Sequence, residues 1–312
     1  MVTGVRVIFL IFGVFPAFLS PTRSQLLPQE CGKLRETQLH NEMEITAPNE
    51  FTWIGRVGYG ESSNPDTKFP CLAVLIHQRF AILPAHCVLS DDDSGNSTAV
   101  FILFGDWRAN SNFKRGDCRL ERGSTTCSPP PQAVDMEQIS VHPQFKLGEH
   151  DYDIALAKMV RNVELSEFVQ PLCLPPAREI EGNHISRRLE MAGFVQEHSW
   201  NEAKILDVDW RRKVARHTTS LEFCTSLTEA LGELTLSQNH LCGIEIEANN
   251  LMSGSPLMDV EVVDGKPRNF YLVGINTFGT VSGTASPIFI DGFMRILPFR
   301  NWILKNIEYA VP

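Results

Sequence analysis

The length, composition and charge of the chain are those of a globular protein. The sequence has 312 residues, of which 43% are hydrophobic and 21% charged, with a formal net charge of −9. This length allows one large domain or two ordinary ones, and the composition excludes disordered, collagenous and coiled-coil chains. The negative charge argues against a nucleic-acid partner or a polybasic membrane-binding surface.

The N-terminus has the features of a secretory signal peptide. Arg6 precedes a thirteen-residue apolar run at residues 7–19, which is too short to cross the roughly 30 Å hydrocarbon core of a bilayer. Small residues at Thr22 and Ser24 predict cleavage after residue 24, with a cut a few residues earlier as the alternative. Loss of the two arginines in this segment changes the net charge from −9 to −11. We therefore expect a secreted protein without a membrane anchor.

Secretion gives the eight cysteines a structural role. An even number in an oxidising compartment indicates four disulfides, although eight cysteines allow 105 pairings. The cysteines are isolated and lack the close ligand pairs typical of zinc sites, so we predict neither a metal nor a cofactor. Asn96 begins an Asn-Ser-Thr sequon in a loop rich in Asp, Ser and Gly, which predicts glycosylation.

Short apolar segments separated by turns predict an antiparallel all-β barrel or sandwich. In chain order they lie at residues 71–83, 97–105, 153–160, 270–279 and 292–297. Near the C-terminus, Phe299, Trp302, Ile303 and Ile307 recur at helical spacing, which predicts an amphipathic helix over residues 299–309 with a packing face.

Three short fragments supply a histidine, an acid and a serine in that order. His86 lies in Leu-Pro-Ala-His-Cys, Asp153 opens Asp-Ile-Ala-Leu, and Ser253 lies in Met-Ser-Gly-Ser-Pro-Leu. Each alone has an ordinary interpretation: a packed histidine, a turn-capping acid and a loop serine. Together they match a triad in which the serine attacks a carbonyl, the histidine takes its proton and the aspartate orients the histidine.

These fragments resemble the chymotrypsin-like (peptidase S1) family of serine endopeptidases. LPAHC stands where the family has TAAHC, DIAL matches outright, and SGSPL stands where the family has SGGPL. NEFTW, QPLCLP, MAGF, GINTFG and a closing NWI are similar to further family segments, so the resemblance covers residues 31–305. It implies two antiparallel six-stranded β-barrels of the trypsin type with a C-terminal helix, and His86, Asp153 and Ser253 as the triad.

The chain is similar in particular to arthropod clip-domain serine proteases and their noncatalytic homologues. We expect no clip domain, since only Cys31 lies between the signal peptide and the protease-like region. The resemblance implies disulfides between Cys31 and Cys173, Cys71 and Cys87, Cys118 and Cys127, and Cys224 and Cys242. The expected division is a signal peptide at residues 1–24, a linker at residues 25–41 and a peptidase S1-like domain at residues 42–312.

The sequence departs from the family at the turn that holds the serine. Leu251 and Met252 replace a glycine and an aspartate. In the family, the amides of the glycine and the serine form the oxyanion hole, where one donor is worth about 10²- to 10³-fold in rate. Leucine resists glycine-like backbone angles and brings a side chain toward the site. Methionine cannot pair with the N-terminal amine that activates a zymogen. We therefore expect the oxyanion turn of Leu251, Met252 and Ser253 to be unformed.

The activation site of the family is also missing from the sequence. Residues 39–43, where the family has a basic cleavage site followed by Ile-Val, read Leu-His-Asn-Glu-Met. Arg-Val-Gly-Tyr-Gly at residues 56–60 is only superficially similar, because it falls inside the expected first core strand.

The resemblance places the specificity pocket at Glu247, Thr277, Phe278 and Gly279. Glu247 falls near the family acid that selects Arg and Lys, but an exposed loop acid is an equal interpretation. Asn249 replaces a family cysteine that braces the pocket.

The resemblance implies a secreted serine protease homologue, impaired in catalysis, that acts by binding in extracellular cascades of the melanisation and innate immune type. Active serine proteases and prophenoloxidase are the expected partners. Two alternatives stay open: an active serine endopeptidase and a secreted recognition protein. For the latter, the basic cluster Arg211-Arg212-Lys213 is the candidate patch, and its ordinary interpretation is a solvated strand edge.

Overall fold

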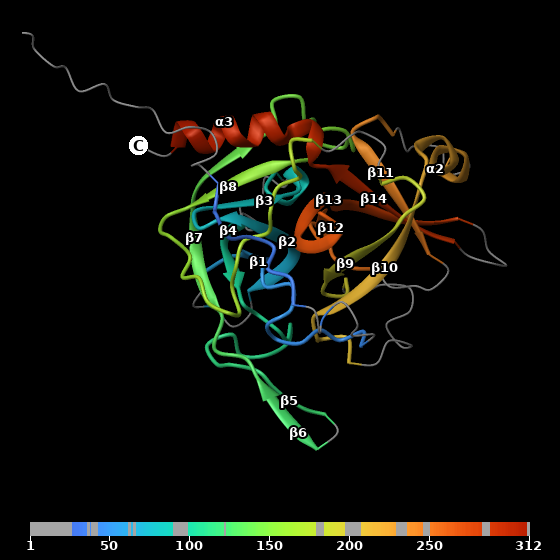
Figure 1. Ribbon diagram of the computed structural model, residues 1–312. Helices are drawn as coiled ribbons and strands as arrows, with labels where there is room; N and C mark the ends of the chain where they lie inside the picture. Colours follow the sequence, from blue (N-terminus) through green and yellow to red (C-terminus); the bar gives the residue numbers. More distant parts are fainter. Residues whose placement is uncertain are drawn as a thin grey trace, which may run out of the picture.

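Two closed antiparallel barrels of six strands each form the fold, as expected from the sequence (Figure 1). The computed structural model describes residues 27–35, 38, 43–61, 64, 67–89, 99–121, 123–178, 184–196, 207–228, 236–245, 250–282 and 288–310. Among these residues, no helix is both long and apolar enough to cross a membrane.

The first barrel is built from the N-terminal half of the chain. Its strands are β1 (Ile54–Tyr59), β2 (Lys68–His77), β3 (Phe80–Leu83), β4 (Ala99–Phe104), β7 (Gln132–Val141) and β8 (Ala155–Met159), which close in the order β1-β2-β3-β8-β7-β4. β2 is almost fully buried. One of its faces points into the barrel and the other packs against the outside of it, so apolar side chains are needed on both faces. Arg56 and Val57 lie within β1, so this pair is part of a core strand as expected.

The second barrel is built from the C-terminal half. Its strands are β9 (Arg188–Gly193), β10 (Arg212–Thr219), β11 (His240–Glu245), β12 (Pro256–Val263), β13 (Lys266–Ser282) and β14 (Ile288–Arg295), which close in the order β10-β11-β14-β13-β12-β9. A two-stranded hairpin of β5 (Cys118–Glu121) and β6 (Ser124–Cys127) projects from the body (Figure 1). A short helix, α2 (Leu221–Thr228), follows β10.

The C-terminal helix α3 (Arg300–Ala310) confirms the amphipathic helix expected at residues 299–309. Phe299 ends the 3-10 turn that precedes it, and Ile303 and Ile307 are buried while Trp302 is half-buried. These side chains join the core cluster that contains the first barrel. The helix therefore follows the second barrel in the chain but packs on the first, which ties the two barrels together.

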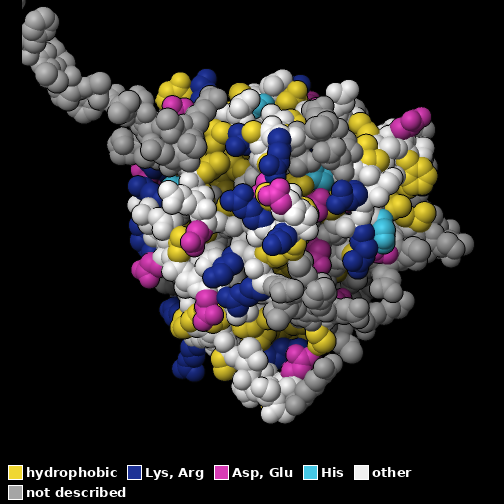
Figure 2. Space-filling model, in the orientation of Figure 1, with side chains coloured by type: hydrophobic (Ala, Val, Ile, Leu, Met, Phe, Trp, Pro, Cys, Tyr) yellow, Lys and Arg dark blue, Asp and Glu magenta, His cyan; other side chains and the backbone are white. Residues whose placement is uncertain are grey.

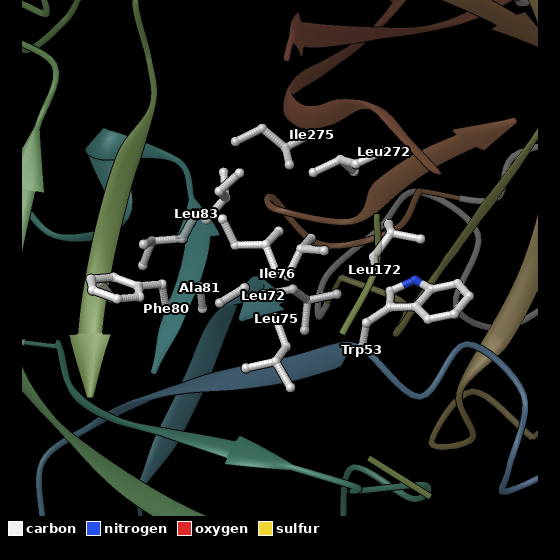
Figure 3. Packing of buried hydrophobic residues seen from close by; sticks show 14 of the residues in the cluster. Trp53, Leu72, Leu75, Ile76, Phe80, Ala81, Leu83, Leu172, Leu272 and Ile275 are labelled. Atoms are coloured by element: carbon white, nitrogen blue, oxygen red, sulfur yellow. The ribbon is translucent and has the colours of Figure 1, made fainter. Parts of the chain in front are cut away.

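One continuous apolar core spans the boundary between the barrels (Figure 3). It contains Leu72 and Leu75 of β2 together with Leu272 and Ile275 of β13. Trp53 packs at one side of this cluster and donates from its indole nitrogen to the sulfur of Met258 at 3.2 Å. The shared core fixes the two barrels relative to each other, which matters because the candidate site uses residues from both.

Four disulfides join the cysteines in the pairs that the resemblance implies. They link Cys31 to Cys173, Cys71 to Cys87, Cys118 to Cys127, and Cys224 to Cys242. All eight cysteines are used, and none is free. Crosslinks of this kind restrict the unfolded chain and typically contribute about 2–4 kcal/mol each.

The basic cluster of Arg211, Arg212 and Lys213 is buried, so its interpretation as a solvated strand edge is wrong. Arg211 is fully buried, and its guanidinium donates to the backbone carbonyl oxygens of Ala47 and Pro48 at 3.2 and 2.9 Å. Burial lowers the pKa of Arg211 to about 10. Other Lys and Arg side chains lie across the face shown in Figure 2, with acidic side chains among them.

The other two cations of the cluster form ion pairs with the segment that precedes the first barrel. Arg212 donates to Glu44 Oε1 at 2.7 Å, and Lys213 donates to Glu50 Oε1 at 2.8 Å. The amide of Lys213 also donates to the carbonyl of Glu44 at 2.8 Å. The segment of residues 44–50 is thus held against the start of β10 by main-chain and side-chain contacts.

Candidate functional site

His86 and Asp153 meet at one end of the first barrel. His86 lies in the 3-10 turn Ala85–Cys87 directly after β3, and Asp153 lies two residues before β8. These two ends are adjacent because β3 and β8 pair antiparallel, with Leu83 opposite Ala155. His86 Nδ1 is 2.6 Å from Asp153 Oδ2, and the amide of His86 donates to Asp153 Oδ1 at 2.9 Å.

The exposed fractions of the two side chains suit a histidine base that is oriented by a buried aspartate. The Asp153 side chain is 3% exposed and that of His86 is 33% exposed. A buried carboxylate that accepts Nδ1–H leaves Nε2 as the nitrogen that can take a proton, and Nε2 lies 3.5 Å from the sulfur of Cys87. His86 could therefore act as a general base, with Asp153 fixing its orientation.

The serine turn is attached to the strand that also holds the histidine turn. Leu72 donates its amide to the carbonyl of Ser253 at 2.8 Å, and Ser253 forms a parallel bridge with Cys71. The Cys71–Cys87 disulfide connects the same strand to the turn of His86. The fold thus brings all three predicted triad residues to one region. Within the described residues, Ser253 and His86 are not joined by a hydrogen bond.

A group of possible metal ligands also lies here, but it does not make a metal site. One ligand atom from each of Cys71, His86 and Cys87 lies within 4.8 Å of the others. Both sulfurs belong to the disulfide, so neither can act as the thiolate that a metal requires.

The oxyanion turn has two buried side chains and two amides without an acceptor among the described residues. Leu251 and Met252 are 3% and 4% exposed and belong to core clusters, so the side chain of Leu251 packs inside the second barrel instead of pointing toward the site. Leu251 forms an antiparallel bridge with Val195, and Met252 donates its amide to Phe194 O at 2.9 Å. The amides of Leu251 and Ser253 donate to no group in the described part of the chain. Two backbone donors therefore remain beside the serine despite the substitutions.

Ser255 has a role that the sequence interpretation missed. Its hydroxyl donates to the carbonyl of Met252 at 2.7 Å, and its amide donates to the same oxygen at 3.1 Å. The amide of Gly254 donates a hydrogen bond to the carbonyl oxygen of Asn276 at 2.7 Å. These bonds close the serine turn from inside, where the family has a glycine in place of Ser255.

The predicted pocket residues Thr277, Phe278 and Gly279 are consecutive on β13. Phe278 is opposite Gly292 of β14, and Thr277 Oγ1 lies 3.4 Å from the carbonyl oxygen of Gly292. The ring of His150 lies 5.1 Å from that of Phe278, so the strand runs close to the segment that leads to Asp153. Thr277 is buried and Gly279 is exposed, which leaves the end of this stretch open to solvent.

Several predicted features lie outside the described residues. They are the signal peptide at residues 1–24, the glycosylation site Asn96, the pocket residue Glu247, and Asn249, which replaces a family cysteine that braces the pocket.

Four buried or half-buried histidines lie near the first barrel and the site, and from them we expect the protein to lose stability in mild acid. Burial lowers the pKa of His77, His142, His150 and His240 below the ordinary value. A lowered folded-state pKa stabilises the fold above the unfolded value of about 6.5, and this stabilisation is lost as the pH falls through the folded-state values. In calorimetry between pH 7.5 and 5.5, we expect the melting temperature of a His240→Gln variant to fall less steeply than that of the native protein. The exposed His217→Gln variant is the control and should follow the native curve. A native curve parallel to that of His240→Gln would contradict the assignment.

Comparisons with known proteins agree with this geometry. A profile of the Trypsin family matches residues 42–303, so the chain belongs to the trypsin family. It is 28% identical over 294 residues to phenoloxidase-activating factor 1 of Holotrichia diomphalia, covering 92% of this chain and 74% of the relative. It is 27% identical to phenoloxidase-activating factor 3 of the same species, with 85% and 71% covered.

The expected similarity to arthropod clip-domain serine proteases is confirmed. The CLIP domain-containing serine protease B9 of Anopheles gambiae is 26% identical, with 83% of this chain and 61% of the relative covered. In fold, the chain matches the crystal structure of the Drosophila Grass clip serine protease of the Toll pathway with a TM-score of 0.69. That match has 20% identity and covers 89% of this chain and 74% of the other.

Proposed function

We propose that the protein is a secreted serine protease homologue with impaired catalysis that acts by binding other proteins in an extracellular proteolytic cascade. The observation that carries this proposal is Met252, an apolar residue buried in the core directly before the serine. A position that should hold a carboxylate for an activating amine holds a side chain that cannot form an ion pair.

The N-terminal segment supports the same conclusion. The switch of the family requires a new N-terminal amine as well as an acid, and residues 39–43 offer neither a basic cleavage site nor Ile-Val. Residues 44–50 are anchored by Arg211, Arg212 and Lys213, so the chain just after the expected cleavage point is already fixed in place.

The partners are proposed from the relatives. Two of these are named phenoloxidase-activating factors. We propose that this protein binds active serine proteases or prophenoloxidase in a cascade of that kind. The apolar run at residues 7–19 and the use of all cysteines in disulfides support secretion.

An active serine endopeptidase is the second candidate. It is favoured by the 2.6 Å contact of His86 with Asp153 and by the amides of Leu251 and Ser253, which donate to no group among the described residues. Both candidates keep the same fold, so they differ only in whether Ser253 is an activated nucleophile.

Labelling with a fluorophosphonate probe decides between them. The probe reacts with a serine that has both a general base and an oxyanion site. We expect the mature protein to be labelled no more than a Ser253→Ala variant, while an active trypsin-family protease in the same assay is labelled strongly. Labelling that depends on Ser253 would reject impaired catalysis and favour the endopeptidase.

Restoring the family residues in the turn should not create activity. The double variant Leu251→Gly and Met252→Asp returns the glycine and the acid but supplies no amine to pair with the acid. We expect its labelling to stay at the level of the Ser253→Ala control.

A further inference from the structure

A buried ion pair lies against the strand that carries the predicted pocket. Arg216 of β10 and Asp291 of β14 are 1% and 3% exposed, and Arg216 Nε–H donates to Asp291 Oδ2. Gly279 is directly opposite Asp291 in the pairing of β13 with β14, and a Cβ placed on Gly279 would lie 3.4 Å from Asp291 Oδ1. The carboxylate therefore reaches the stretch formed by Thr277, Phe278 and Gly279.

The neighbouring strands leave space for the Arg216 side chain and donate a hydrogen bond to the Asp291 carboxylate. A Cβ placed on Gly243 of β11 would lie 3.1 Å from Cβ of Arg216, so glycine at this position leaves room for the arginine stem. Asn276 Nδ2 lies 3.4 Å from Asp291 Oδ1 and donates to it. A cation and an amide thus share one buried carboxylate, which is the arrangement that a buried charge requires.

We propose that Arg216 occupies, from inside the second barrel, the position where this pocket would bind a cationic side chain of a partner protein. A buried carboxylate beside an exposed strand end would select a guanidinium or an amine. Arg216 already neutralises Asp291, so a second cation beside this carboxylate would meet a like charge and gain no free anion from Asp291. The part of the pocket beside Asp291 is therefore closed to Arg and Lys side chains and accepts an uncharged side chain or none.

This inference rests on the pocket placement that the family resemblance implies, but not on whether Ser253 reacts. Fluorophosphonate labelling without binding of a cation would reject impaired catalysis and leave the inference standing. Binding of a cation without labelling would reject the inference alone.

Binding of benzamidine tests the proposal, because its amidinium resembles the arginine head group and benzamide is a neutral control of the same shape. By isothermal titration calorimetry, we expect no saturable binding to the native protein up to about 10 mM, the weak end of small-ligand affinity. An Arg216→Ala variant should bind benzamidine and gain about 3 °C in melting temperature at a tenfold excess over Kd. Benzamide should have no effect on it. The double variant Arg216→Ala with Asp291→Ala should lose the binding.

Two results would overturn the proposal. Saturable benzamidine binding to the native protein would show that the pocket is open to cations, and this measurement needs no variant. Binding that persists in the double variant would show that Asp291 is not the anion. Arg216→Met keeps the apolar stem and removes only the guanidinium, so it replaces Arg216→Ala if that variant does not fold.

Discussion

Replacing Gly254 by alanine is expected to destabilise the protein by about 3 kcal/mol or more, which corresponds to roughly 6–10 °C in melting temperature. Gly254 has φ +90°, and a Cβ there would lie 1.9 Å from the carbonyl oxygen of Leu72. That oxygen belongs to the backbone of β2 and cannot rotate away as a side chain would. The strand or the serine turn must therefore move, which also strains the hydrogen bond from Leu72 to Ser253.

Gly265→Ala is the matched control for this prediction. Gly265 has φ +73° and nothing within 4 Å of the added Cβ. The only penalty for alanine there is its unfavourable positive φ, which costs about 1–2 kcal/mol of stability. Differential scanning calorimetry of both variants separates the contact from the dihedral preference. If the two variants lose equal stability, the close approach of Leu72 is not the cause.

The sequence predicts the framework of this molecule well because its signals are local. Apolar segments bounded by turns mark the strands, and the motifs around His86 and Asp153 mark the ends of β3 and β8. The pairing of those strands then brings the two side chains together. The amphipathic pattern of residues 299–309 likewise identifies α3 without reference to its partner.

The buried charges could not be predicted in the same way. A run such as Arg211-Arg212-Lys213 usually indicates a solvated face, and its acceptors at residues 44–50 lie more than 160 positions away in the sequence. The same limit applies to Arg216 and Asp291, which are 75 positions apart. Single-sequence patterns show charge but not the partner that makes burial possible.

Removing the charge of Lys213 is expected to be among the most destabilising single substitutions in the chain. In a Lys213→Met variant the carboxylate of Glu50, itself 1% exposed, stays buried without its cation, which typically costs about 3–5 kcal/mol. The amide of Ala47 still donates to Glu50 Oε2 at 3.0 Å, but one neutral donor does not replace an ion pair. Burial raises the pKa of the neighbouring Glu190, and loss of Lys213, which lowers that pKa, adds to the penalty. Calorimetry at pH 7 should show a melting temperature lower by roughly 6–15 °C.

The double variant Lys213→Met with Glu50→Gln tests whether the unpaired carboxylate is the cause. The glutamine side chain keeps an oxygen for the amide of Ala47 and removes the buried charge, and replacement of both members of a buried pair is often close to neutral. We therefore expect the double variant to recover most of the lost stability, with a coupling energy of about 2–3 kcal/mol between the two sites. Glu50→Gln alone leaves Lys213 buried near Phe51, with the carbonyl of Gln38 as its acceptor at 3.4 Å, and should be less stable than the double variant. A double variant as unstable as Lys213→Met would mean that the unpaired carboxylate of Glu50 is not the cause of the lost stability.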